Sequence, residues 1–275
     1  MILRRLAGRM SSRKALTYVG ASRNMLYYRE SGKKSSARKD DAILDLVKRI
    51  GAERPAYGTR RLAAAVSREI KKPVNRKHVQ RICRKTGMIR PYTTKKDAVR
   101  HGSHKVTATR PCEVWEMDIT YIPGGPSWAY CHTVLDVFTR EWAGYVLSTS
   151  AAAAGAVEAL LDALHRHPDA DPAGLTIRTD HGSQYTSKEF NSAIRSLGVG
   201  HEYIWYKTPQ QNGHLESFHA KLKMEYVWPA DPESFQEVEG IILGAFVDYN
   251  TRRLHSSIGY MPPAEFAARW RDEHK

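Results

Sequence analysis

The region from residue 113 to residue 204 constrains the fold most, because short segments with the two-residue period of strands are followed by strands alternating with helices. Gly124-Gly125-Pro126 lies between the first two segments, where a hairpin turn is expected. The five expected strands lie at 113–122, 128–138, 141–148, 174–179 and 200–204. Three strands in hairpin order, followed by alternating helices and strands, predict an α/β domain.

The helices of this half are expected from their composition and caps. Residues 151–167 form an apolar, alanine-rich helix. Thr186 and Glu189 have the spacing of a capping box for a helix that ends near Gly198. Ser234 and Glu237 have the same spacing and open a helix that runs to about Asn250.

The first expected strand carries an acid on a polar face. Its odd positions from 115 to 121 are apolar, whereas its even positions are Glu116, Asp118 and Thr120. Since side chains alternate along a strand, one face is expected to be apolar and the other to carry Asp118. Asp136, in the second strand, competes for the same role but lacks this alternation.

Two further acids have settings that suit chemistry. Asp180 follows the short strand that ends at Arg178 and enters a glycine-containing loop. Glu216 lies at the edge of an apolar helical stripe, near His219 and Lys223. Three carboxylates brought together repel one another, and they suit hard divalent cations that take oxygen ligands. A pair of such ions promotes in-line displacement at a phosphodiester, but each acid could also be an ordinary solvated or capping residue.

The positive charge of the chain is concentrated in its first half. Residues 1–110 hold 30 Lys and Arg against 7 Asp and Glu, whereas residues 111–275 hold 13 against 22. A front half with a net charge of +23 predicts nucleic acid as the partner, although charge can also serve solubility alone.

Three helices are expected in this basic half. They begin near Asp41, after Tyr57-Gly58 and at Asn75, which is a plausible N-cap, and Ser31–Ser36 reads as a linker. The third helix has an inward apolar face and a basic outer face, as in a helix-turn-helix, or simply a solvated face on a small bundle. The outer face consists of Lys77, Gln80, Arg81, Arg84 and Lys85.

The settings of the acids, taken with several other motifs, resemble those of a known family. The Asp118, Asp180 and Glu216 settings are similar to those of DDE transposases with a retroviral-integrase-type catalytic core. The chain looks most like the second-reading-frame product of insertion sequences of family three. From residue 40 to the end, the motifs that carry this resemblance also include Arg54-Pro-Ala-Tyr57-Gly58-Thr-Arg60-Arg61-Leu62, Val74–Val79, Tyr249–Tyr260 and Pro262-Pro263-Ala-Glu265-Phe266.

The resemblance implies a ribonuclease H-like catalytic core behind an N-terminal helix-turn-helix domain. With it we expect a DNA-binding domain at 40–92 and the core with C-terminal helices at 111–275, while composition alone predicts a basic segment and linker at 1–39 and a linker at 93–110. Asp118, Asp180 and Glu216 would be catalytic and would hold two Mg²⁺ ions, for which Mn²⁺ can substitute.

The partners implied are DNA, both terminal repeats and target, further copies of the chain on DNA and a first-frame product of the same element. Asn212, His219 and Lys223 are further expected DNA contacts. Asn212 lies in a segment, 209–213, that reads either as an inert turn or as a mobile loop that admits DNA to Glu216. His181 reads either as a satisfied loop residue or as a substrate contact.

Two other functions stay open at this point: a DNA-binding regulator without catalysis, and a structure-specific nuclease on the same core. Loss of an acid would favour the regulator, and failure to join strands would favour the nuclease. The chain has no apolar run of membrane-spanning length and no secretion signal, and its three cysteines have no metal-ligand spacing. We therefore expect a cytoplasmic, nucleoid-associated protein.

Overall fold

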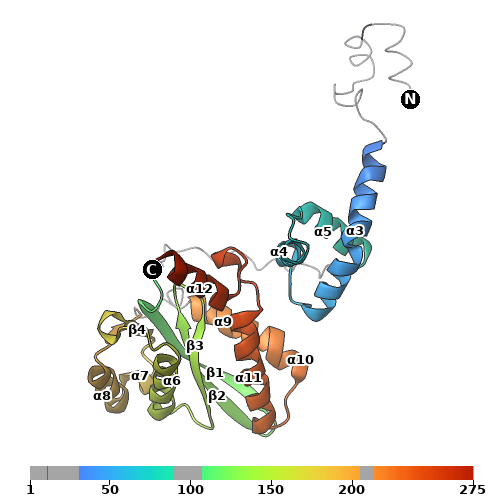
Figure 1. Ribbon diagram of the computed structural model, residues 1–275. Helices are drawn as coiled ribbons and strands as arrows, with labels where there is room; N and C mark the ends of the chain where they lie inside the picture. Colours follow the sequence, from blue (N-terminus) through green and yellow to red (C-terminus); the bar gives the residue numbers. More distant parts are fainter. Residues whose placement is uncertain (1–10, 12–30, 89–106, 205–212, 275) are drawn as a thin grey trace. The chain divides into compact units, whose positions relative to one another are not determined.

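The computed structural model describes residue 11 and residues 31–88, 107–204 and 213–274, with the side chains of 31–40 and 42 left aside (Figure 1). The chain divides into two compact units. The first comprises Met1–Glu53 and Leu62–Ile89, and the second comprises Arg54–Arg61 and Arg90–Lys275. Residues 54–61 thus pack with the second unit, although they interrupt the first in sequence.

The first unit is built from three helices, α3 (Ser31–Glu53), α4 (Thr59–Glu69) and α5 (Arg76–Lys85). Helix α3 begins ten residues before the expected start near Asp41, so the expectation of a linker at Ser31–Ser36 is wrong. Residues 31–40 include lysine, serine and alanine but no proline, which is the residue that would stop a helix. Asn75 caps α5 as expected, because its side chain accepts a hydrogen bond from Lys77 N at 2.8 Å.

The second unit is a five-stranded mixed sheet with the order β3-β2-β1-β4-β5. The strands are β1 (Val114–Gly124), β2 (Ser127–Asp136), β3 (Trp142–Ser148), β4 (Thr176–Thr179) and β5 (Gly200–Tyr203). β1, β2 and β3 pair antiparallel, whereas β4 is parallel to β1 and β5 is parallel to β4. The five expected strands are confirmed to within a few residues, and so is the hairpin turn, where Gly125 has a φ of +73°.

Helices cover both faces of this sheet. One face packs against α6 (Ala153–Arg166), α7 (Ser183–Thr186) and α8 (Lys188–Leu197), around Trp115, Leu160 and Phe190. The other packs against α9 (Gly213–Leu222), the π-helical turn η4 (Lys223–Val227) and α11 (Phe235–Thr251), around Trp142 and Leu215. The short helices η2 (Pro172–Gly174), α10 (Trp228–Ala230) and η5 (Ser256–Ile258), and α12 (Pro263–Glu273), complete the unit (Figure 1).

The caps of the helices correct one expectation and confirm another. The N-cap of α8 is Ser187, whose hydroxyl accepts from Phe190 N at 3.1 Å, and not Thr186, whose hydroxyl donates to the preceding turn. Thr186 instead ends α7, a helical turn that the sequence did not reveal. Ser234 does cap α11, accepting from Glu237 N at 3.2 Å.

Both faces of β1 are buried, which differs from the expected apolar and polar faces. Glu116 and Thr120 are 1% and 3% exposed, whereas Tyr121, expected among the apolar positions, is 50% exposed. The reason is that α9 and α11 cover the face that carries Asp118, where Ile122 contributes to the apolar cluster. The acid therefore lies in a packed environment.

Candidate active site

Asp118 lies in the middle of β1 and is held by its strand neighbours. Its Oδ1 accepts a hydrogen bond from Ile119 N at 2.8 Å. Its backbone carbonyl accepts one from the hydroxyl of Thr133, the residue opposite on β2, at 3.0 Å. Its Oδ2 lies 3.6 Å from Nδ1 of His219 on α9. Two strands and one helix thus fix this carboxylate.

Asp180 and Glu216 come from the two elements that flank Asp118. Glu116 pairs with Arg178 in the parallel register of β1 and β4, so Asp180 is reached two residues beyond Arg178 at the level of Asp118. Asp180 Oδ1 accepts from Gly182 N at 2.8 Å, which orients its carboxylate at the start of the loop. Glu216 is exposed in the first turn of α9.

The electrostatics of Asp118 indicate that the three acids face one region. The pKa of Asp118 is raised to about 7, mainly by burial and also by the negative charges of Asp180, Glu216 and Glu116, against the hydrogen bond from Ile119 N. One carboxylate shifts the pKa of another in this way only when the two lie within about 10 Å of each other. In the described part of the chain, however, no three His, Cys, Asp or Glu side chains are gathered closely enough to hold a metal ion.

The donor chemistry of the three acids nevertheless fits a hard cation. All are carboxylates, which are the ligands that Mg²⁺ and Mn²⁺ prefer, and the repulsion that Asp118 experiences is what a cation would neutralise. The acids Asp118, Asp180 and Glu216 are therefore the residues that would hold such ions.

Asp136 is a structural acid. It is 2% exposed, and its Oδ2 accepts from Cys112 N at 2.7 Å and Trp115 Nε1 at 3.1 Å. Its Oδ1 accepts from Phe138 N at 2.8 Å and Thr139 N at 2.7 Å. Because both oxygens are occupied by protein donors, Asp136 fixes the β2–β3 turn and does not compete with Asp118 as the first acid.

The side chains expected to contact DNA near the acids differ in their burial and neighbours. His219 is 8% exposed, and its Nε2 lies 2.8 Å from the Thr133 hydroxyl, so its ring packs against β2 and leaves little surface for the expected DNA contact. Burial lowers its pKa to about 3, with Lys223 adding to the effect, so the ring is neutral at physiological pH. Lys223 is half-buried and is close enough to Asp118 for the two charges to interact. Asn212 lies outside the described residues.

His181 contacts the end of β5. Its Nε2 lies 3.0 Å from the Ile204 carbonyl, and its ring stacks on Tyr203 with centroids 4.9 Å apart. These contacts tie the loop after Asp180 to the end of β5 and favour the structural alternative for this residue.

The basic face of α5 is partly exposed. Lys77, Arg84 and Lys85 are exposed, whereas Gln80 and Arg81 are half-buried. Val79, Ile82 and Cys83 are buried on the opposite side, as expected.

A cluster of polar side chains around the buried Glu116 was not predicted from the sequence. Glu116 Oε1 lies 3.6 Å from Arg178 Nη1 and 3.3 Å from His214 Nδ1, and Arg178 Nε lies 3.1 Å from Glu202 Oε2. Glu116, Arg178 and His214 each lie two residues before one of the three acids. The only signal in the sequence was the position of Glu116 on the same strand face as Asp118.

This group yields a prediction about stability. We expect Arg178→Met to lower the free energy of unfolding by about 3–5 kcal/mol, because Glu116 would remain as a buried charge without its main cation. Urea unfolding measures this. The control Arg195→Met changes an exposed arginine and should shift stability by no more than about 0.5 kcal/mol. Adding Glu116→Gln to Arg178→Met should recover part of the loss; equal losses in the single and double variants would contradict the pairing.

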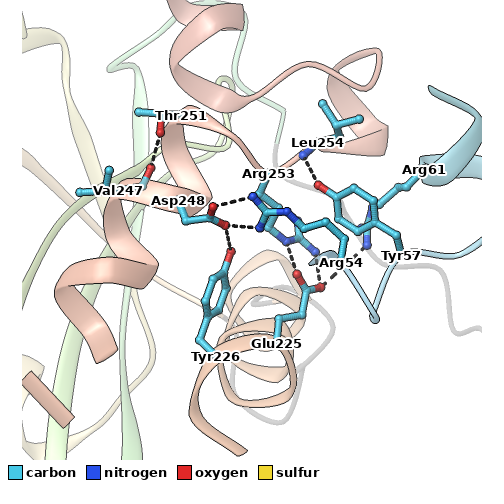
Figure 2. A network of polar contacts seen from close by, with 10 residues as sticks. All are labelled: Arg54, Tyr57, Arg61, Glu225, Tyr226, Val247, Asp248, Thr251, Arg253 and Leu254. Carbon is cyan, nitrogen blue, oxygen red and sulfur yellow. Dashed lines mark hydrogen bonds and ion pairs between the residues drawn. The ribbon is translucent and has the colours of Figure 1, made fainter. Parts of the chain in front are cut away.

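A second polar network joins residues 54–61 to the C-terminal helices within the second unit (Figure 2). Arg54 Nη2 contacts Asp248 Oδ1 at 2.6 Å, and the Tyr226 hydroxyl donates to Asp248 Oδ2 at 2.8 Å. Leu254 N donates to the Tyr57 hydroxyl at 2.8 Å. The motif around Tyr57 is therefore part of the packing of this unit.

Glu225 organises the other half of this network (Figure 2). Both of its oxygens accept from Arg253, from Nε and Nη2, at 2.7 Å, and Arg61 Nη1 lies 3.9 Å away. Arg253 is 1% exposed, so this bidentate pair satisfies a buried cation. The conspicuous basic residues of two distant motifs thus meet at one carboxylate.

Comparison with known proteins agrees with this architecture. Residues 108–208 and 197–263 each match an integrase core domain family, and residues 38–96 match the HTH-like domain family. The simian T-cell lymphotropic virus intasome contains a chain with the same fold, with a TM-score of 0.52, 19% identity and coverage of 74% of this chain and 70% of that one. The fold and site define an integrase-type protein with a DNA-binding domain.

Several related sequences come from insertion elements. The transposase for insertion sequence element IS904 of Lactococcus lactis is 34% identical over 58% of this chain, but the match spans only 62% of that protein. The IS407 31.7 kDa protein of Burkholderia multivorans is 28% identical over 95% of this chain and 92% of its own length. A putative IS986/IS6110 transposase of Mycobacterium tuberculosis is 26% identical over 88% and 93%. The chain is similar to insertion-sequence transposases with an integrase core, consistent with insertion-sequence family three.

No helix in the described ranges is long and apolar enough to cross a membrane.

Proposed function

We propose that the protein is a DNA transposase that cleaves DNA at the ends of its element and joins the freed 3′-hydroxyl to a target phosphodiester. The observation that carries this proposal is that the charges of Asp180, at the end of β4, and Glu216, on α9, act on Asp118 of β1 within an integrase core. Cleavage uses water to break the P–O3′ bond. Joining exchanges one phosphodiester for another, so no external energy source is needed.

Asp118, Asp180 and Glu216 would hold two Mg²⁺ ions, or Mn²⁺ in their place. Such ions activate the attacking oxygen and stabilise the leaving oxygen during in-line displacement. The protein orients its acids for this role through backbone donors, Ile119 N on Asp118 and Gly182 N on Asp180. Thr133 and His219 keep the Asp118 segment in place, and Lys223 adds positive charge beside it for a DNA phosphate.

The DNA partners would be the terminal repeats of the element, bound in part through α5, and the target. Two ends must be held together, so we propose self-association on DNA, and a first-frame product of the same element as a further partner. A transposase of this kind would work on cytoplasmic, nucleoid-associated DNA.

A joining assay separates this proposal from its alternatives. The purified chain is incubated with labelled element ends and Mg²⁺, with and without the upstream product fused to it. Joined products support a transposase, cleavage without joining under both conditions supports a nuclease, and binding alone supports a regulator.

The basic face of α5 supports a prediction about DNA binding. We expect Lys77→Ala with Arg84→Ala to weaken binding to end DNA and to lower the slope of log K against log salt by roughly 0.9 for each phosphate that the variant no longer neutralises. Both side chains are exposed, so folding should survive. The measurement is fluorescence anisotropy over a salt series. Lys188→Ala with Arg195→Ala, which removes two exposed cations of the second unit, is the matched control; equal salt slopes in wild type and the α5 variant would assign the face to solvation.

A further inference from the structure

A cavity of 410 Å³ lies beside α9 in the second unit. At 100° per residue, Ser217 and Lys221, which line the cavity, lie about 100° and 140° around the helix from Glu216. The cavity and Glu216 therefore lie on different sides of α9, and this one helix borders both. Its charged lining consists of Arg61, Arg140, Lys221 and Arg253.

The cations of this lining fall into two kinds. Arg253 donates two hydrogen bonds to Glu225, and Arg61 Nη1 lies 3.9 Å from the same carboxylate (Figure 2). Arg140 Nη1 is buried without a hydrogen-bond partner, and burial lowers the pKa of this guanidinium against the opposing effect of Glu116, Tyr249 and Asp136. Lys221 forms no hydrogen bond or ion pair with another described residue. The four cations of the lining thus outnumber the three carboxylates that act on them, Glu225, Glu116 and Asp136.

The turn that carries Arg140 is built to hold it in place. Arg140 has a φ of +65°, a left-handed conformation that residues other than glycine rarely adopt. Its backbone N–H donates to the Asp136 carbonyl at 3.0 Å, and the Asp136 carboxylate accepts from Phe138 N and Thr139 N. Strained conformations of this kind persist where the surroundings over-determine them, and they often serve a binding function.

The rest of the lining suits a nucleotide more than a small ion. The volume lies within the range of pockets for organic ligands. His255 is neutral at physiological pH because burial, reinforced by nearby arginines, lowers its pKa to about 3, and its Nδ1 lies 2.9 Å from the Ser257 hydroxyl. Neutral hydrogen-bonding groups and the N-terminal turn of α9 accompany the cations, as is typical of phosphate sites.

We propose that this cavity binds a backbone phosphodiester of a DNA strand, with Arg140 and Lys221 as the phosphate contacts. This inference rests on the proposed function, since the strand is one held by a transposase. An α-helix with its side chains is about 10–12 Å across, so a strand at the acids reaches the cavity within a few nucleotides. The cavity would then determine which phosphodiester of the strand lies at the acids.

The test is a coupling measurement on element-end DNA with the full chain in metal-free buffer. Single methylphosphonate linkages, which remove one phosphate charge, are placed in turn at each position flanking the cleavage site, and affinity is measured by anisotropy. We expect one position at which the neutral linkage lowers wild-type affinity about tenfold but lowers that of Lys221→Gln and Arg140→Gln less than about twofold. Lys188→Gln and Arg195→Gln, matched exposed cations on α8, should keep the full tenfold effect.

The outcomes separate this inference from the proposed function. Additive effects at every position would overturn the phosphodiester contact, whatever the cleavage assay shows. If inorganic phosphate raises the melting temperature of the wild type but not of Lys221→Gln, and no linkage couples, the cavity is a free-anion site and the strand proposal fails. Because the buffer contains no metal, the coupling is measured without cleavage, and a coupled but inactive protein would overturn the transposase proposal alone. Lys221 is only partly buried, so its variant keeps the test valid if Arg140→Gln does not fold.

Discussion

Asp180→Asn is expected to reduce cleavage and joining of element ends by at least about 10³-fold in Mg²⁺. The asparagine keeps the shape of the side chain, and its carbonyl oxygen can still accept from Gly182 N. It removes one of the three charges that would hold the proposed ions, and such ions supply several kcal/mol of transition-state stabilisation. The measurement is the single-turnover rate on labelled end DNA, with DNA affinity measured in parallel.

DNA affinity should persist in this variant, because the basic first unit is unchanged. Asp169→Asn, which alters an exposed acid after α6, is the matched control and should react at the wild-type rate. Asp118→Asn and Glu216→Gln should fail in the same way as Asp180→Asn. A wild-type rate for Asp180→Asn would remove the catalytic assignment and favour the regulator.

Asp118→Asn is expected to stabilise the metal-free protein while it abolishes catalysis. Burial and the neighbouring carboxylates raise the pKa of Asp118 from an ordinary 3.8 to about 7. The folded state therefore retains a proton that the unfolded chain has lost, and the free energy of unfolding of the wild type falls as pH rises from about 4 through 7. The difference between the two pKa values corresponds to at most about 4 kcal/mol.

The gain from Asp118→Asn should be nearly absent at pH 3, where the carboxyl is largely protonated in both states, and nearly complete at pH 8. Urea unfolding at the two pH values measures it, with Asp169→Asn as the control that should show no gain. Mg²⁺ should raise the stability of the wild type at pH 8 by mass action and have less effect on the variant. An Asp118→Asn protein that is no more stable than wild type at pH 8 would contradict the repulsion inferred for the site.

The local pattern of the sequence determined most of the secondary structure. Alternation and turn residues predicted the five strands and the hairpin at Gly125, because the period of side chains along a strand is a local property. Asn75 and Ser234 were recognisable as caps for the same reason. The choice between Thr186 and Ser187 was not, because the short helix α7 takes up Thr186 first.

Only the tertiary structure decided which polar residues are buried and with whom. His219 lies beside Glu216 on the helix, yet its position over β2 buries it against Thr133. The pairing of Glu116 with Arg178 depends on the register of two parallel strands, and that of Arg54 with Asp248 on packing between segments 194 residues apart. Spacing along one chain identifies candidate acids, but the neighbours that set their charge are chosen by packing, which no local period encodes.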